Sequence, residues 1–339
     1  MTGTLVFGAG VLGSLYAARI HQAGYEVSVL ARGQRLTELR EHGILLRHAL
    51  HGRQTHVTVP VVDRLDADDT YDLIVVLVRD DQLDSTFETL ARTPTTSTLL
   101  FMVNNPAGSA RIADAVGAER LMLGFPGAAG YRTAETVHYL VLPRWFQPTT
   151  LGEPDGRRTG RLTDARAMFR YSGFPVSLCQ DMDAWYKYHA AWVAPVAYAI
   201  YAASGSNLDL ARQPELIRLM LRAINEGWDA LRVLGFPLTP RTLRLLQVLP
   251  EAGLVRLLAK VLTTRFADAA AYRHAQAAPA EMTLLARDLR AVIKPAGRAT
   301  PAWDALQAAG DAALLGADPE PRSRSGTFAR TDDRPREAT

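Results

Sequence analysis

The chain has 339 residues, of which 48% are hydrophobic and 22% charged, and its formal net charge is +3. This composition is typical of a globular protein, and the length favours two domains. The net charge is too small to indicate nucleic-acid binding, since no basic stripe interleaved with aromatics accompanies it. No apolar run reaches the roughly 18 residues that a membrane helix requires, so no membrane partner is expected.

The compartment can be inferred from the first residues and from cysteine usage. The start of the chain lacks the basic segment and cleavage site of a signal peptide. Cys179 is the single cysteine and cannot form an internal disulfide. Both features favour a reducing, cytoplasmic location.

The first half of the chain alternates strand and helix patterns. Apolar runs predict buried strands, and residues at helical spacing lie between them. A strand pair is expected at residues 43–50 and 55–62, and parallel strands are expected at residues 4–10, 25–32, 71–79, 96–104 and 119–127. Such alternation indicates a doubly wound, mainly parallel sheet. Further strand segments at 135–142, 148–153 and 174–181, with a helix at 160–173, complete this part.

From Asp181 onward only helical periodicity is found. Long helices are expected at residues 183–204, 214–235, 251–268 and 279–297, separated by Gly/Pro turns. The predicted organisation is therefore an α/β doubly wound domain at residues 1–180 and an all-α domain at residues 181–317. Residues 318–339 are polar and rich in Pro and Arg, which predicts a disordered tail.

A glycine-rich loop follows the first expected strand and opens the first expected helix. It comprises Gly8, Ala9, Gly10, Val11, Leu12 and Gly13. In a G-x-G-x-x-G loop the first glycine permits a tight turn, the second lets the backbone approach a pyrophosphate, and the third allows close helix–strand packing. The free N–H groups of the helix N-terminus favour the phosphates. The loop therefore predicts a Rossmann-type dinucleotide site.

The end of the second strand carries Arg32, where an NAD-binding domain usually has Asp or Glu for the ribose hydroxyls. An acidic residue would repel a 2′-phosphate, whereas a guanidinium pairs with it. We therefore expect NADP(H) as the cofactor. The eight histidines include His42, His48, His51 and His56, but none has the spacing of a metal site, so no metal is expected.

Together with this loop, several further segments resemble the ketopantoate (2-dehydropantoate) reductase family over nearly the whole ordered chain. They are LIVVLVRDDQ with Arg79 and Gln82, FMVNN with Asn104 and Asn105, LGEPDG, AWYKYHAAWVAP with Lys187, NEGWDALRVLGF with Glu226 and Gly235, and PAEMTLLARDL with Glu281. Each motif is modest, but their order and spacing make the similarity strong.

The resemblance implies hydride transfer from NADPH to the carbonyl carbon of a 2-keto acid, with a role in pantothenate biosynthesis. It implies that Lys187 is the general acid, that Glu281 anchors the substrate, and that Asn104 borders the nicotinamide. It also places Arg79 and Gln82 in the cofactor site. The residues support Lys187 independently, because a lysine among Trp185, Tyr186 and Tyr188 near an expected cleft is unusual. A surface lysine with an apolar stem, or Glu281 simply complementing a helix dipole, is the alternative.

The substrate-binding positions depart from the family pattern. The family has asparagines four and eight residues after the lysine, where this chain has Ala191 and Pro195. It also has a glycine six residues after the glutamate, where Arg287 stands. Each lost hydrogen bond to a charged substrate group is worth about 1.5–3 kcal/mol. Two alternatives therefore stay open: a reductase of a less polar carbonyl or imine, and an NADP(H)-binding sensor with little catalysis. Dimerisation through the C-terminal helices is a further expectation.

Overall fold

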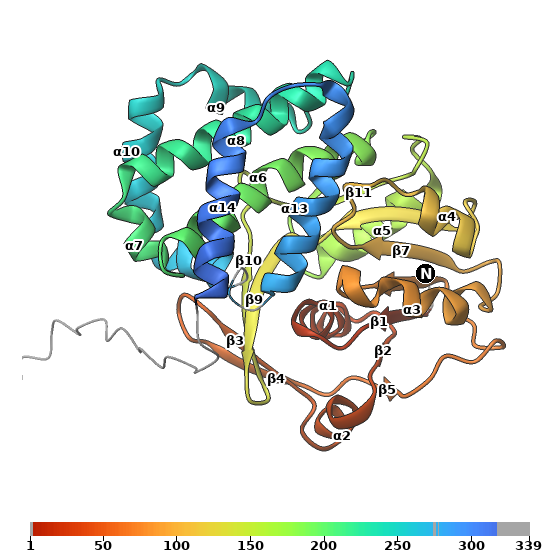
Figure 1. The fold of residues 1–339 in the computed structure, drawn as a ribbon. Coiled ribbons are helices and arrows are strands. Elements are labelled where there is room, and N and C mark those ends of the chain that lie inside the picture. The colour runs from red at the N-terminus through yellow and green to blue at the C-terminus, as the bar shows by residue number, and fades with distance from the viewer. Residues whose placement is uncertain (1–2, 274–275, 277, 317–339) are drawn as a thin grey trace, which may run out of the picture.

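The computed structural model describes residues 3–273, 276 and 278–316. It has a part built of strands and covering helices, which comes first in the chain, and a helical part that follows it (Figure 1). The predicted disordered tail at 318–339 lies outside the described residues. The α/β part followed by a helical part confirms the predicted fold class.

Within the described residues, eight strands form the main sheet in the order β12-β11-β8-β7-β6-β1-β2-β5. All neighbours are parallel except β11 and β8. The strands are β1 (Thr4–Phe7), β2 (Val27–Leu30), β5 (Val61–Val62), β6 (Leu73–Val76), β7 (Thr98–Met102), β8 (Leu121–Phe125), β11 (Thr149–Gly152) and β12 (Val176–Leu178). The central strands β1, β6 and β7 are buried along their whole length, because helices cover both faces of the sheet.

Alternate residues of each central strand enter two different cores. Val6 and Val75 pack with α1 (Val11–Gln22) and α5 (Gly160–Tyr171) on one face. Leu5 and Ile74 pack on the other face, which α3 (Asp80–Ala91) and α4 (Ala110–Val116) cover. This alternation follows from the two-residue period of a strand. The short helix α2 (Gly33–His42) follows β2.

A second sheet of four strands, in the order β4-β3-β10-β9, lies beside α1. Its strands are β3 (Ile44–His48), β4 (Gln54–Val57), β9 (Ala128–Thr133) and β10 (Thr136–Val141). The predicted strand pair appears as the antiparallel β3–β4 pair. The sequence did not predict that β3 would join β10 in parallel across some 90 residues of chain, because a register between distant segments leaves no local pattern.

Every element that the structure describes after Asp181 is helical, as predicted. The long helices α6 (Met182–Ala202), α8 (Pro214–Val233), α13 (Pro279–Ile293) and α14 (Pro301–Leu315) pack around one apolar core. Shorter helices complete it: α7 (Asn207–Ala211), α9 (Arg244–Val248), α10 (Glu251–Leu262), α11 (Arg265–Ala267), η1 (Arg241–Leu243), η2 (Asp268–Tyr272) and η3 (Lys294–Ala296). Glu226 of α8 accepts hydrogen bonds from the backbone N–H groups of Ala302 and Trp303, which caps the first turn of α14.

Helix α6 connects the two parts. Its first turn is capped by Asp181, whose carboxylate accepts a hydrogen bond from the Ala184 backbone N–H at 2.8 Å. One turn later, the buried Tyr186 hydroxyl donates to the carbonyl of Gly124 on β8 at 2.8 Å. The helix is thereby fixed against the main sheet at its start. The domain boundary between residues 180 and 181 stays a prediction.

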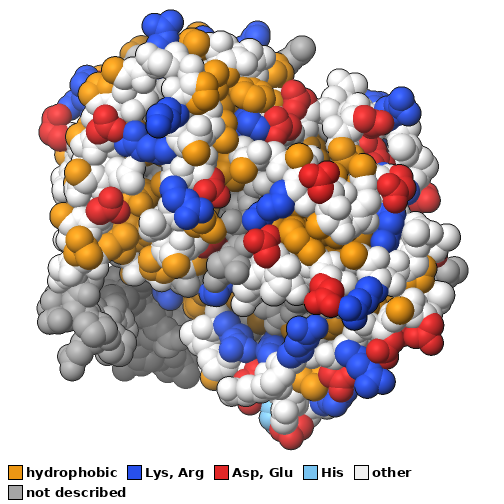
Figure 2. All heavy atoms as spheres, turned by 45° about the vertical axis from the view of Figure 1, so that its right-hand side comes forward, with side chains coloured by type: hydrophobic (Ala, Val, Ile, Leu, Met, Phe, Trp, Pro, Cys, Tyr) orange, Lys and Arg blue, Asp and Glu red, His pale blue; other side chains and the backbone are white. Residues whose placement is uncertain are grey.

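The face shown in Figure 2 carries basic and acidic side chains interspersed with one another over both parts of the molecule. This distribution agrees with the small net charge of the sequence. Among the described residues, no helix combines the length and the apolar character that crossing a membrane would require.

Candidate functional site

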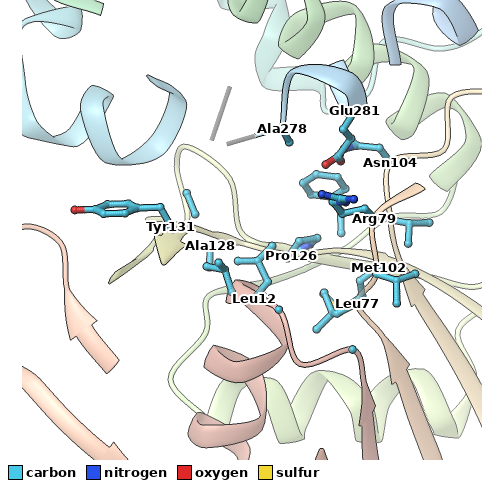
Figure 3. Close-up of a pocket in the computed structure, with 18 of the residues that line it drawn as sticks. Leu12, Leu77, Arg79, Met102, Asn104, Pro126, Ala128, Tyr131, Ala278 and Glu281 are labelled. Carbon is cyan, nitrogen blue, oxygen red and sulfur yellow. The ribbon is translucent and has the colours of Figure 1, made fainter. Parts of the chain in front are cut away.

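A cleft of about 1000 Å³ lies where the carboxyl ends of the parallel strands meet the helical part (Figure 3). The residues that follow β1, β2, β6, β7 and β8 all contribute to it, including Gly8, Arg32, Arg79, Asn104 and Pro126. Helices α6 and α13 form the opposite wall. Ligands of open α/β sheets bind in such a crevice beyond the strand ends.

The glycine loop lies at the floor of this cleft. Gly8 has φ +113°, and a Cβ there would lie 2.4 Å from the carbonyl oxygen of Leu77. A Cβ on Gly13 would lie 1.8 Å from the Gly8 carbonyl oxygen, so only glycine permits this approach of helix to loop. Gly10, in contrast, has open space around it. The cleft is lined by Gly8, Ala9, Gly10, Val11 and Leu12, while Gly13 is buried behind them.

This loop has the shape of a phosphate cradle. It places the N-terminus of the twelve-residue helix α1 at the cleft, with Gly10 as the residue before the first turn. A helix N-terminus attracts anions through its free N–H groups. The loop therefore fits the pyrophosphate of a dinucleotide, and the open space at Gly10 is where a side chain would otherwise block it.

Two arginines of the segment after β2 line the cleft beside the loop. Arg32 is exposed at the start of α2. Arg35 is nearly buried: its guanidinium donates to the Ala9 carbonyl at 3.1 Å and to the Ser14 hydroxyl at 3.0 Å. Burial lowers the pKa of Arg35, and the adjacent Glu38 opposes this effect. The sequence interpretation chose Arg32 alone; Arg35, one helical turn later, also reaches the site and holds the loop.

A third arginine approaches the same end of the cleft from the second sheet. Arg132 of β9 donates to Glu38 at 3.0 Å, and Glu38 also accepts from Arg35. Glu38 thus holds two cationic side chains side by side. This end of the cleft is the one suited to an additional phosphate group.

The strands β6 and β7 deliver polar side chains to the other end of the cleft. Arg79, which precedes α3, and Asn104, which follows β7, both line the cleft, as does Gln82 in the first turn of α3. In Figure 3, Arg79 lies between the strand ends and the Asn104–Glu281 pair. Arg79, Asn104 and Glu281 therefore lie at one end of the cleft, and Gln82 also lines it.

Asn104 and Glu281 connect the two parts of the molecule. The Asn104 side-chain amide donates to Glu281 Oε1 at 2.7 Å, across 177 positions of sequence. Glu281 lies in the first turn of α13, after Pro279. The sequence predicted a substrate anchor at Glu281 and a nicotinamide neighbour at Asn104; the structure brings both to the same place.

Helix α6 presents a mostly apolar face to the cleft. This face consists of His189, Trp192, Val193, Val196, Ala197 and Ile200. Phe125, Phe146 and Met282 add apolar surface from other elements. The His189 ring stacks on Trp185 at a centroid distance of 4.8 Å and is tilted against Phe125 at 4.3 Å. His189 therefore lines the cleft, a position that the sequence alone did not indicate.

The structure does not bring Lys187 to the cleft. Its ammonium forms an ion pair with Asp183, one turn earlier on the same helix, and lies 4.7 Å from the centroid of the Phe236 ring. Two residues correspond to about 200° around a helix, so Lys187 and His189 occupy opposite faces of α6. The catalytic role of Lys187 stays a prediction that this geometry does not support.

The departures from the family pattern also lie away from the cleft. Ala191 packs against α8, where a Cβ on Gly227 would be 3.2 Å from the Ala191 Cβ. Pro195 is buried, and α6 continues through it. Arg287 is largely exposed and pairs with Asp288 at 3.0 Å. None of the three is among the residues that line this cleft.

The single cysteine lies close to the start of α6 but takes no visible part in the site. Burial raises the pKa of the Cys179 thiol to about 11, and the thiol donates to the Asp181 carbonyl at 3.3 Å. A thiol in this state is a poor nucleophile.

Part of the chain matches a known protein family. Residues 4–153 match the family described as "Ketopantoate reductase PanE/ApbA". The matched range contains the glycine loop, Arg32, Arg79, Gln82 and Asn104. None of the curated proteins compared with the chain by sequence matches it.

Solved structures share the fold over almost the whole chain at low sequence identity. The structure of 2-dehydropantoate 2-reductase from Geobacter metallireducens GS-15 is 19% identical, with a TM-score of 0.71, covering 92% of this chain and 99% of that one. A PanE/ApbA family ketopantoate reductase from Ralstonia eutropha JMP134 is 17% identical, with a TM-score of 0.68, covering 92% and 99%. D-mandelate dehydrogenase with NADH and anilino(oxo)acetate is 16% identical, with a TM-score of 0.69, covering 92% and 98%.

Proposed function

Residues 4–153 belong to the ketopantoate reductase PanE/ApbA family, and from this premise we propose that the protein is an NADPH-dependent reductase of a 2-keto acid. The observation that carries the proposal is the arrangement of the cleft. It has a glycine cradle and arginines at one end, and the Asn104–Glu281 pair with Arg79 at the other. Reduction of a 2-keto acid requires both a dinucleotide and a charged substrate to meet in one such space.

The cofactor end is assigned from the chain's own groups. The backbone of the Gly8–Gly13 loop and the N-terminus of α1 would hold the pyrophosphate. Arg32 and Arg35 would pair with the 2′-phosphate of NADP(H), for which NAD(H) offers only a hydroxyl. When bound, the reduced cofactor supplies a hydride. NADP(H) is thus the cofactor that the positive charge at this end favours.

The substrate end would bind a 2-keto acid by its polar atoms. Arg79 offers a guanidinium that can hold a carboxylate in two hydrogen bonds. Asn104 has a side-chain amide that can donate to the keto oxygen, and Glu281 can accept from a substrate hydroxyl. Held in this way, the keto carbon would be oriented before the hydride arrives, which lowers the entropic part of the barrier.

The apolar face of α6 favours a second candidate within the same chemistry. Trp192, Val193, Val196 and Ile200 form a wall that a small polar keto acid would leave unpartnered. A 2-keto acid with a bulky aryl substituent would bury this wall, at about 25 cal/mol for each Å² of apolar surface. The fold neighbour D-mandelate dehydrogenase was solved with anilino(oxo)acetate, a ligand of this shape. We therefore favour a bulky 2-keto acid over 2-dehydropantoate itself.

The test is an NADPH-oxidation screen over 2-keto acids of increasing substituent size, from pyruvate to phenylglyoxylate, with 2-dehydropantoate as the reference and cyclic imines as a separate group. We expect turnover of 2-keto acids, and higher kcat/KM for bulky ones, with NADPH preferred over NADH. Turnover of imines and of no keto acid would mean that the substrate is an imine. Tight NADPH binding without turnover of any compound would favour a sensor. Pantothenate biosynthesis, a cytoplasmic location and a homodimer stay predictions.

A further inference from the structure

We propose that His189 donates the proton to the substrate oxygen in this reduction, a role that rests on the proposed function. The geometry of α6 carries the inference. His189 lies on the helix face that lines the cleft, four and eight residues before Val193 and Ala197 on the same face. Lys187 lies on the opposite face of α6, where its ammonium pairs with Asp183 and lies over the Phe236 ring.

The other charged groups of the cleft are poorly suited to this step. Among the described residues, the cationic side chains that line it are Arg32, Arg35, Arg79 and Arg132, and arginine does not release its proton in proteins. Glu281 accepts a hydrogen bond from Asn104, as a carboxylate does. Tyr131 lies at the far side of the cleft from Glu281 and Asn104 in Figure 3. Histidine is the side chain that titrates between pH 5 and 8, where a general acid is most efficient.

The surroundings of His189 hold its ring in one place. Trp185, one turn earlier on α6, stacks on it with an interplanar angle of 12°. Phe125, at the end of β8, contacts it from the sheet side and also lines the cleft. A ring held between α6 and the main sheet is preorganised for proton transfer.

The substrate's keto carbon accepts the hydride with its electron pair, and the π pair of the C=O bond moves to the oxygen. That oxygen forms an O–H bond with the proton of the His189 imidazolium, whose N–H bond breaks. The products are the 2-hydroxy acid, oxidised cofactor and neutral imidazole, which regains a proton from solvent.

The experiment compares His189→Gln with His21→Gln, a control at an exposed histidine in the last turn of α1. For the keto acid that wild type turns over best, we expect His189→Gln to lower kcat about 100-fold, a usual contribution of a general acid. KM and the NADPH Kd should change less than threefold. The wild-type kcat should fall as pH rises, because the imidazolium deprotonates. This decrease of kcat with pH should be absent in His189→Gln and present in His21→Gln.

The same assay tests Lys187 as the alternative proton donor. If Lys187→Met lowers kcat 100-fold and removes the decrease of kcat with pH while His189→Gln retains both, Lys187 is the donor and the present inference is overturned, although the proposed function stands. If wild type turns over no keto acid, the proposed function and this inference fall together.

A binding measurement guards against a variant that misfolds. In wild type labelled with ¹⁵N-histidine, the His189 signals, assigned by their loss in His189→Gln, should shift when oxamate is added to the NADPH complex. The His21 signals should stay unchanged. A His189 signal that does not respond to bound oxamate would overturn the inference without any activity assay.

Discussion

The proposed cofactor end and the proposed substrate end of the cleft are built by different means. At the cofactor end the backbone itself forms the site: a glycine loop at the end of β1 and the N-terminus of α1. At the substrate end, side chains on α6 and α13 form it, and their direction depends on the rotation of each helix. A shift of two residues keeps a strand side chain on the same face of the sheet, but it moves a helical side chain to the opposite face of the helix. The first kind of site is therefore far easier to predict.

The largest effect should come from the closest approach at the cofactor end. In Gly13→Ala, the new Cβ would lie 1.8 Å from the Gly8 carbonyl oxygen, so α1 must move away from the loop. We expect a loss of about 3 kcal/mol of unfolding free energy and no measurable NADPH binding. Thermal unfolding and NADPH fluorescence measure the two effects.

Gly10→Ala is the matched control for this loop, because its Cβ meets no atom within 4 Å. Its stability should stay within about 0.5 kcal/mol of wild type, while a methyl group in the phosphate cradle should weaken NADPH at least tenfold. Equal destabilisation by the two variants would mean that the loop is a packing feature and not a binding site.

At the substrate end, a further large effect should come from Glu281. Glu281→Gln keeps an oxygen to accept from Asn104 but removes the charge that would hold a substrate hydroxyl. Hydrogen bonds to charged groups are worth about 1.5–3 kcal/mol, so kcat/KM should fall about 10- to 100-fold with the NADPH Kd unchanged. Asp288→Asn is the control, since Asp288 lies on the same helix and pairs with Arg287. A variant at 281 with normal kcat/KM would leave Glu281 only as a contact between the two parts.

The two arginines after β2 allow a finer comparison within the cofactor end. Arg32 is exposed, and in the proposed function its partner is the 2′-phosphate, so Arg32→Gln should weaken NADPH about tenfold and leave NADH unaffected. Arg35 also donates to Ala9 and Ser14, so Arg35→Gln should weaken both cofactors. The measurement is the Kd of each of the two variants for NADPH and for NADH. If Arg32→Gln weakens NADH as much as NADPH, the assignment of the 2′-phosphate to Arg32 is wrong.

These contrasts explain what the sequence could and could not predict. The apolar strands, the glycine loop and the helical second part each leave a local pattern, and all were found. Arg35 carried a signal, one turn after Arg32 on the predicted helix, but its contact with Ala9 depends on how α2 packs. The pairing of β3 with β10 left no local trace.

The face of α6 that lines the cleft was the hardest feature to predict. Apolar residues surround this helix, because one side packs on α8 and α14 while the other forms the cleft wall. Periodicity therefore cannot separate the two sides, and a resemblance anchored on Lys187 selected the side that packs against α8. Only the tertiary structure distinguishes His189 from Lys187.

The smallest expected effect concerns the apolar wall, and it is best measured as a ratio of kcat/KM values for two substrates. Trp192 lines the cleft and stacks on Trp228 behind it, so Trp192→Ala will also cost stability. The ratio of kcat/KM for phenylglyoxylate to that for pyruvate is independent of the folded fraction, because both substrates are measured on one preparation.

If the Trp192 indole contacts the substituent of the keto acid, this ratio should fall about tenfold in Trp192→Ala, as removal of apolar contact area predicts. Tyr171→Ala, at an exposed aromatic far along α5, should leave the ratio unchanged. An unchanged ratio in Trp192→Ala would mean that the substrate stops short of α6, and the preference for bulky keto acids would then have to come from Phe125, Phe146 or Met282.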